Sequence, residues 1–237
     1  MITLNIKRVL VAFMTVGPII LTSCSSNQEL NEAIECKVVV GDIEFTHAMN
    51  DADKYITENE GIITFSAKAH TDYFRDPDGT VLDNAPILLK EIDNTKPFTF
   101  QALLTPGFTE TGTYNAAALY VFSSPLLWQK FAFEQDERGI HRVVTVRTIE
   151  TSDDNNHEAI TDSDSVWFKI SSDGGRIACY YSPDGETWQM VRLYKNNYPE
   201  KLFIGISSQG PGEDACISQF KKLSLTYGSV GNFRLGE

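Results

Sequence analysis

The chain has 237 residues, of which 42% are hydrophobic and 11% aromatic, so it is long and apolar enough to build a folded core. This composition excludes a disordered chain. The formal net charge is −12, with no visible basic face, which excludes a typical nucleic-acid binder and favours an acidic, solubilising surface.

The N-terminal segment has the pattern of a bacterial export signal. Lys7 and Arg8 precede an apolar run over residues 9–21 that is too short to span a bilayer. The following Leu21-Thr22-Ser23-Cys24 resembles the lipobox of bacterial lipoproteins. That resemblance implies that residues 1–23 are a signal peptide and that Cys24 is lipidated and becomes the first mature residue. The alternative is an ordinary secretory signal followed by a chance cysteine.

A lipid anchor would place the protein on the bacterial cell envelope. Removal of residues 1–23 takes away two positive charges and no negative one, so the net charge changes from −12 to −14. Ser25 stands where many inner-membrane lipoproteins carry Asp, so we expect the outer membrane. Residues 24–35 are short and polar and are predicted to be a lipidated tether, and no second apolar segment approaches a membrane span.

From Cys36 onward the chain alternates apolar and polar residues between turn signals rich in Gly, Pro and Asp. No segment sustains a helical period beyond two turns. The pattern predicts an all-β domain over residues 36–228, a two-sheet antiparallel jelly-roll sandwich, followed by a C-terminal tail at 229–237. The predicted strands cover residues 62–70, 98–104, 116–122, 128–133, 142–149, 166–170, 176–181, 189–193, 202–207 and 217–226.

Strand alternation separates core residues from outward-facing ones. The predicted core residues are Phe131, Phe133, Val166, Phe168, Ile170, Val191, Leu193, Ile204 and Ile206. Outward tryptophans beside charged and amide side chains suit carbohydrate, because sugar faces stack on the rings while hydroxyls bond the polar groups. The candidate ligand-binding residues are Trp128, Lys130, Glu134, Trp167, Lys169, Arg192 and Gln209. Two alternatives stay open: loops that cover the tryptophans, and a one-residue slip that inverts the assignment.

Six segments, in order, resemble the concanavalin A-like family named "regulation of enolase protein 1", whose biochemical role is essentially unassigned. They are residues 71–74, 119–122, 128–134, 166–170, 180–192 and 204–209, and the most specific is the Tyr-Tyr-Ser-Pro-Asp-Gly run that begins at Tyr180. The resemblance covers roughly residues 60–226 and implies a lectin/glucanase-like jelly roll. It implies no activity, because this fold hosts binders, hydrolases and inert modules.

Catalytic motifs are nearly absent from the sequence. The run from Glu91 to Lys96 begins the Glu-x-Asp-x-x-Glu pattern of laminarinase-type glycosidases and ends on Lys instead of Glu, which indicates chance. Glu134 would form a carboxylate pair with Asp72 or Asp153 only if the fold brings them together. Residues 182–188 resemble the Asp-box hairpin of sialidases but are one residue shorter, and we interpret them as a tight turn.

The cysteines and acidic residues do not predict a metal or cofactor site. If Cys24 is lipidated, Cys36, Cys179 and Cys216 remain, and we expect three buried thiols, although a disulfide from Cys216 to either of the others is an alternative. No two cysteines have zinc-ligand spacing. Residues 153–164 are rich in oxygen ligands, yet they lack the glycine-spaced loop of a calcium site, so we expect a solvated acidic loop.

The sequence therefore favours a membrane-anchored envelope lipoprotein whose lectin-like domain binds a glycan without catalysis. A divergent glycoside hydrolase or lyase, and a protein-interaction module that uses the same aromatic side chains, are the alternatives. We expect no nucleic-acid partner.

Overall fold

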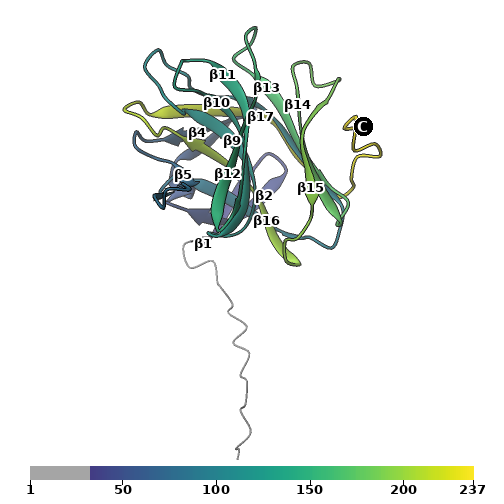
Figure 1. Cartoon of the computed structure of the whole chain (residues 1–237). Helices are drawn as coiled ribbons and strands as arrows, with labels where there is room; N and C mark the ends of the chain where they lie inside the picture. The colour runs from purple at the N-terminus through teal and green to yellow at the C-terminus, as the bar shows by residue number, and fades with distance from the viewer. Residues whose placement is uncertain (1–32) are drawn as a thin grey trace, which may run out of the picture.

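The computed structural model describes residues 33–237, so Cys24 and the predicted signal peptide lie outside the described range. Two antiparallel sheets pack face to face as two layers (Figure 1). The eight-stranded sheet has the order β1-β2-β7-β16-β9-β10-β11-β12. Its strands are β1 (Ile34–Val40), β2 (Ile43–Met49), β7 (Ile87–Asp93), β16 (Lys201–Gln209), β9 (Ala116–Ser124), β10 (Leu127–Gln135), β11 (His141–Ile149) and β12 (Thr151–Ala159).

The second layer has seven strands in the order β15-β14-β13-β8-β17-β4-β3. They are β15 (Gln189–Lys195), β14 (Arg176–Ser182), β13 (Val166–Ser172), β8 (Phe98–Thr105), β17 (Cys216–Thr226), β4 (Ile62–Ala67) and β3 (Ile56–Asn59). A separate hairpin is formed by β5 (Tyr73–Arg75) and β6 (Val81–Asp83), and a 3-10 turn, η1 (Ala52–Lys54), is the one helical segment of residues 33–237. The predicted antiparallel jelly-roll sandwich is confirmed.

The alternation of side chains along the strands builds the core between the layers. Seven of the nine predicted core residues are almost fully buried there: Phe131, Phe133, Val166, Phe168, Ile170, Ile204 and Ile206. The Phe131 ring from one sheet stacks on the Phe168 ring from the other, with centroids 3.8 Å apart. Such contacts make the two layers one cooperative unit.

The predicted alternation of β15 is wrong because this strand contains a bulge. Its pairing with β14 shifts between Cys179 and Tyr180, so Val191 is the extra residue. Val191 still packs against the core, but Leu193 packs on the opposite, outer face of its sheet, so its predicted core position is incorrect.

Both outer faces of the sandwich are partly covered. The β5–β6 hairpin supplies Tyr73, which lies in an apolar cluster on the outer face of the eight-stranded sheet. The last ten residues of the chain, yellow in Figure 1, lie beside β14 and β15, where Phe233 packs with Tyr180. A face of an antiparallel sheet that sequence alternation marks as outward is therefore not necessarily solvent-exposed here.

Residues 151–159 form the edge strand β12, so the predicted loop is wrong for residues 153–159, although most of these side chains are exposed as expected and residues 160–164 do lie in a loop. The strand was missed because its acidic and amide side chains show no alternation with apolar residues. Such polar side chains protect a sheet edge against pairing with another chain. Asp153 and Asp154 project to opposite faces of this strand, which separates two of the carboxylates of this acidic run. Within residues 33–237, no three His, Cys, Asp or Glu side chains are grouped to hold a metal ion.

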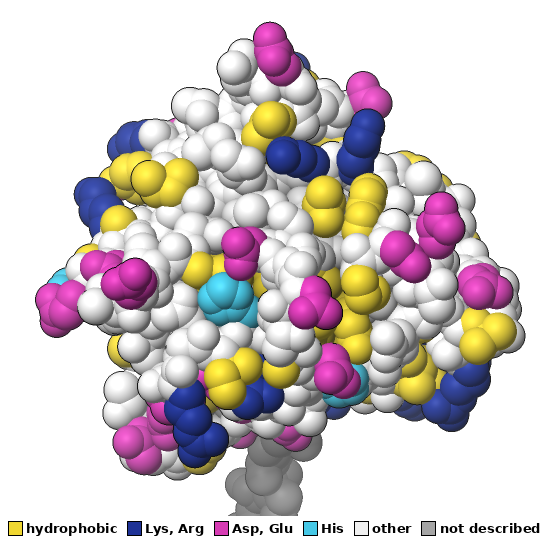
Figure 2. All heavy atoms as spheres, turned by 90° about the horizontal axis from the view of Figure 1, so that it is seen from above, with side chains coloured by type: hydrophobic (Ala, Val, Ile, Leu, Met, Phe, Trp, Pro, Cys, Tyr) yellow, Lys and Arg dark blue, Asp and Glu magenta, His cyan; other side chains and the backbone are white. Residues whose placement is uncertain are grey.

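The three described cysteines are free thiols, and Cys179 and Cys216 are buried as expected, while Cys36 is only half-buried. No helix among residues 33–237 is both long and apolar enough to cross a bilayer. Acidic side chains are scattered over the face drawn in Figure 2 and do not gather in one patch, in keeping with the acidic composition.

Candidate functional site

The seven side chains predicted to form one site lie in different places. Lys130 and Glu134 of β10 and Gln209 of β16 belong to the outer face of the eight-stranded sheet. Trp167 and Lys169 of β13 belong to the other sheet, on the side opposite its core residue Phe168. The sandwich core separates the two groups, so no single ligand touches them all.

Trp128 lies on the predicted face of β10, but its predicted role as an exposed stacking surface is incorrect. Its exposed fraction is 0%. The Tyr73 ring from the β5–β6 hairpin packs edge-on against it, with centroids 5.4 Å apart, and the indole Nε1 donates to the Pro125 carbonyl at 3.2 Å. The indole is a packing element of a covered sheet face.

Lys169 and Trp167 are also engaged within the protein. The Lys169 ammonium lies 3.6 Å from the Trp188 ring centroid and donates to the Gly236 carbonyl at 2.9 Å. Burial lowers the Lys169 pKa to about 8. Trp167 is half-buried and faces Gly185, whose position leaves no room for a side chain against the indole. These two residues support the chain's own C-terminal segment and hairpin.

Arg192 is predicted to face outward, and the bulge in β15 turns it inward to the sandwich edge. Its Nε donates to Thr145 Oγ1 on β11 at 3.0 Å, and one terminal nitrogen lies 3.5 Å from Asp153 on β12. Arg192 therefore joins the two sheets at their edge. Asp153, which faces Arg192, lies on the inner face of the eight-stranded sheet. It cannot form a carboxylate pair with Glu134, which lies on the outer face.

Lys130, Glu134 and Gln209 do converge, in a cavity of about 340 Å³ on the outer face of the eight-stranded sheet. The strand register brings Gln209 and Glu134 together. Gln209, Ala116 and Glu134 form one row across β16, β9 and β10, and Ala118 and Ala132 lie side by side in the next row. These three alanines are buried and none of them lines the cavity, so its lining from these strands comes from Lys130, Glu134 and Gln209.

Lys130 is buried at 2% exposure and is held by three acceptors. Its ammonium donates to Asp72 Oδ1 at 3.1 Å, to the Tyr73 carbonyl at 3.1 Å and to Gln209 Oε1 at 2.9 Å. The Gln209 amide nitrogen in turn donates to the Tyr114 carbonyl at 3.0 Å and to Glu134 Oε2 at 3.4 Å. Asp72 and Glu134 thus line one cavity, connected through a lysine and an amide.

Glu134 has the most unusual carboxyl of this cavity. Burial raises its pKa to about 8, and Asp72 and Asp154 add to the effect while Lys130 opposes it. The Asp154 carboxyl, on β12, also has a raised pKa because it is partly desolvated. Perturbed carboxyls in a concave site are typical of functional positions. Register places Asp154 two strands away from Glu134 and in the row of Lys130.

The mouth of the cavity carries side chains that the sequence did not single out. Phe74, Leu82, Pro211 and Tyr114 line it. Tyr114 is 41% exposed and has a φ of 60°, in the left-handed region that non-glycine residues rarely occupy. Such strained conformations concentrate at functional sites. No alternation marks Tyr114, because it precedes β9 in a loop.

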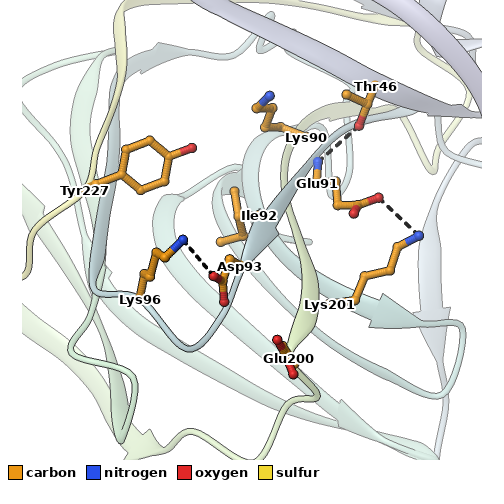
Figure 3. A pocket seen from close by; sticks show the side chains of 9 residues that line it. All are labelled: Thr46, Lys90, Glu91, Ile92, Asp93, Lys96, Glu200, Lys201 and Tyr227. Atoms are coloured by element: carbon orange, nitrogen blue, oxygen red, sulfur yellow. Dashed lines mark hydrogen bonds and ion pairs between the residues drawn. The ribbon is translucent and has the colours of Figure 1, made fainter.

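A second, wider cavity of about 930 Å³ contains the failed glycosidase motif. Figure 3 shows that four of its charged side chains form two ion pairs: Lys201 with Glu91 at 3.1 Å and Lys96 with Asp93 at 2.9 Å. These pairs are largely solvent-exposed, so screening leaves them weak. Lys96 stands where the glycosidase motif requires its second Glu, so the motif is incomplete here. The cavity beside Lys130 is therefore the better candidate for a functional site.

The turn at residues 182–188 has a structural explanation. Asp184 Oδ1 accepts hydrogen bonds from the backbone nitrogens of Glu186 and Thr187 and from the Ser182 hydroxyl, each at 2.8 Å. These bonds lower the Asp184 pKa to about 2. The Asp184 carboxylate therefore stabilises its own turn through these hydrogen bonds, as the sequence interpretation expects.

The fold and cavity define an all-β protein of jelly-roll type with a small polar hollow on one sheet face. The chain belongs to the family described as "Protein of unknown function (DUF1349)", whose model matches residues 49–227. No curated protein matches the sequence. The finer resemblance to the "regulation of enolase protein 1" family stays a prediction.

Solved structures with a similar fold include a protein of unknown function and two GH43 proteins. A functionally unknown protein from Saccharomyces cerevisiae is 21% identical, with a TM-score of 0.69 over 85% of this chain and 100% of that one. The GH43 protein BlXynB from Bacillus licheniformis is 12% identical, with a TM-score of 0.58 over 84% of this chain and 39% of that one. GH43B of Bacteroides ovatus, from a xyloglucan locus, is 12% identical with a TM-score of 0.56, over 78% of this chain and 36% of that one. At these identities the similarity concerns the fold.

Proposed function

We propose that this protein is a lipid-anchored envelope protein whose domain binds carbohydrate, without catalysis, in the cavity beside Lys130. The observation that carries the proposal is the cavity itself, whose lining combines buried hydrogen-bonding groups with an exposed tyrosine. A stacking ring above fixed polar groups suits a sugar, which has apolar ring faces and hydroxyl edges. The similarity in fold to parts of two GH43 proteins supports a saccharide ligand.

A glycan array with the purified full-length protein tests the proposal. We expect at least one hit, and Tyr114→Ala should weaken it by roughly tenfold to a hundredfold, the effect of one lost aromatic contact. Tyr227→Ala is the matched control, because Tyr227 is 66% exposed and lines the other cavity. Absence of binding to plant, host and bacterial glycans would contradict the proposal. Equal loss of glycan binding in Tyr114→Ala and Tyr227→Ala would show that the binding site is not this cavity.

Glycoside hydrolysis is a second candidate, favoured by Glu134 alone. A carboxyl with a pKa of about 8 is protonated at neutral pH and suits a general acid. The weakness of this candidate is the second carboxylate, because Asp72 is bonded to Lys130. If the array hit is also cleaved, Glu134→Gln should abolish cleavage while binding persists. A hit that stays intact through prolonged incubation supports binding only.

The lipid anchor at Cys24 is a part of the proposal that rests on the sequence. Cys24→Ala should release the protein from the membrane fraction and remove palmitate labelling. A Cys24→Ala variant that still sediments with membranes and carries label would overturn the anchor. The outer-membrane location predicted from Ser25 is checked by separating the two membranes.

A further inference from the structure

The hydrogen-bond donors of the cavity are already used within the protein. An ammonium group has three N–H donors, and Lys130 donates them to Asp72, the Tyr73 carbonyl and Gln209. The Gln209 amide has two N–H donors, which go to the Tyr114 carbonyl and to Glu134. Neither residue retains a donor for a ligand.

The acceptors, in contrast, are numerous. Apart from Lys130, the charged side chains that line the cavity are all acidic: Asp72, Asp76, Glu134, Glu137 and Asp154. The remaining lining donors are the Asn156 amide and the Tyr114 hydroxyl. A protonated Glu134 would add one donor, but this residue is only 8% exposed and lies at the buried end.

We infer that the cavity selects neutral or amine-bearing sugars and rejects sugars that carry a carboxylate, such as uronic and sialic acids. This inference rests on the proposed carbohydrate binding and adds the charge class of the ligand. Sugar hydroxyls and ammonium groups donate to carboxylates, so they match an acceptor-rich lining. A ligand carboxylate is an acceptor only and would face Asp72, Asp76, Glu137 and Asp154 without an available cation, because Lys130 is already engaged within the protein.

The test uses three matched oligosaccharides on the full-length protein at pH 7.5: one neutral, one with a single free amino sugar and one with a single uronic acid in the same position. We expect the neutral and amino forms to bind and the uronic form to bind at least about tenfold more weakly, because like charges placed together are costly. Asp154→Lys, an exposed substitution at the rim, should reverse this order by strengthening the uronic form and weakening the amino form. Glu186→Lys makes the same charge change on the far sheet, away from the cavity, and should leave the order unchanged.

The outcomes separate the two proposals. Binding of the uronic form as tight as that of the neutral form overturns the charge selection and leaves carbohydrate binding standing. The same shift in Asp154→Lys and Glu186→Lys also overturns the selection, because the effect is then one of net charge. If none of the three probes nor any glycan on the array binds, both proposals fall.

Discussion

Trp128 and Trp167 lie on opposite outer faces of the sandwich, with the shared hydrophobic core between them. Each belongs to a different sheet, and each is covered by a different segment of the chain. Trp128 packs under Tyr73 of the β5–β6 hairpin, and Trp167 packs against the turn at Gly185. The two indoles therefore have separate structural roles.

We expect Trp128→Ala to destabilise the fold by about 3–5 kcal/mol, as much as Phe168→Ala, because both rings are fully buried and leave large cavities. Trp167→Ala should cost less, since this indole is only half-buried. Urea unfolding of the three variants measures the difference. A Trp128→Ala variant with wild-type stability would contradict the burial of its ring.

Glu134 should make the protein less stable as the pH rises. Its folded-state pKa of about 8 lies above the 4.5 of an ordinary glutamate, so the folded protein holds a proton that the unfolded chain releases over this range. The free energy of unfolding then falls between those pH values, by on the order of 5 kcal/mol. Glu134→Gln should remove this decline in urea titrations at pH 5 and pH 9. Glu137→Gln, at an exposed position nearby, is the control and should keep it.

Gly185→Ala should be more damaging than Gly139→Ala, although both glycines have positive φ, 80° and 74°. A Cβ at Gly185 would lie 2.9 Å from the Trp167 ring, whereas nothing lies within 4 Å of one at Gly139. The backbone conformation alone costs roughly 1–2 kcal/mol in each case. We expect an additional loss of about 1 kcal/mol or more at Gly185, from steric overlap. Equal melting temperatures for the two variants would be inconsistent with the packed turn.

The C-terminal segment should contribute to stability through one side chain. Phe233 is 5% exposed, lies 4.0 Å from the Arg176 guanidinium and presents its carbonyl to the Tyr180 hydroxyl at 2.8 Å. Phe233→Ala should cost about 2–4 kcal/mol. Leu235 is 51% exposed and only two residues away, so Leu235→Ala should change stability by less than about 0.5 kcal/mol. Denaturant unfolding that finds the two substitutions equivalent would show that the segment is not docked in solution.

The sequence alone was sufficient for the fold class and for most of the strands that build the sandwich. Ten predicted strands are present, and the alternation of residues 128–134 places Phe131 and Phe133 in the core and Lys130 and Glu134 on the other side. This works because a side-chain period of two links a residue's position directly to a sheet face. Seven strands of residues 33–237 were not predicted: β1, β2, β3, β5, β6, β7 and β12. Alternation is absent from two of them, because β7 is buried on both faces at its start and β12 is a polar edge.

The tertiary structure decided which outward residues meet and which are accessible. The sequence cannot tell that β10 and β13 belong to different sheets, since sheet order depends on contacts between distant segments. A hairpin 50 residues upstream covers Trp128, and one bulge turns Arg192 inward. The cavity beside Lys130 depends on the pairing of β16, β9 and β10, which places Gln209 and Glu134 in one row. Local patterns thus determined the faces of this protein, and only long-range pairing determined its candidate site.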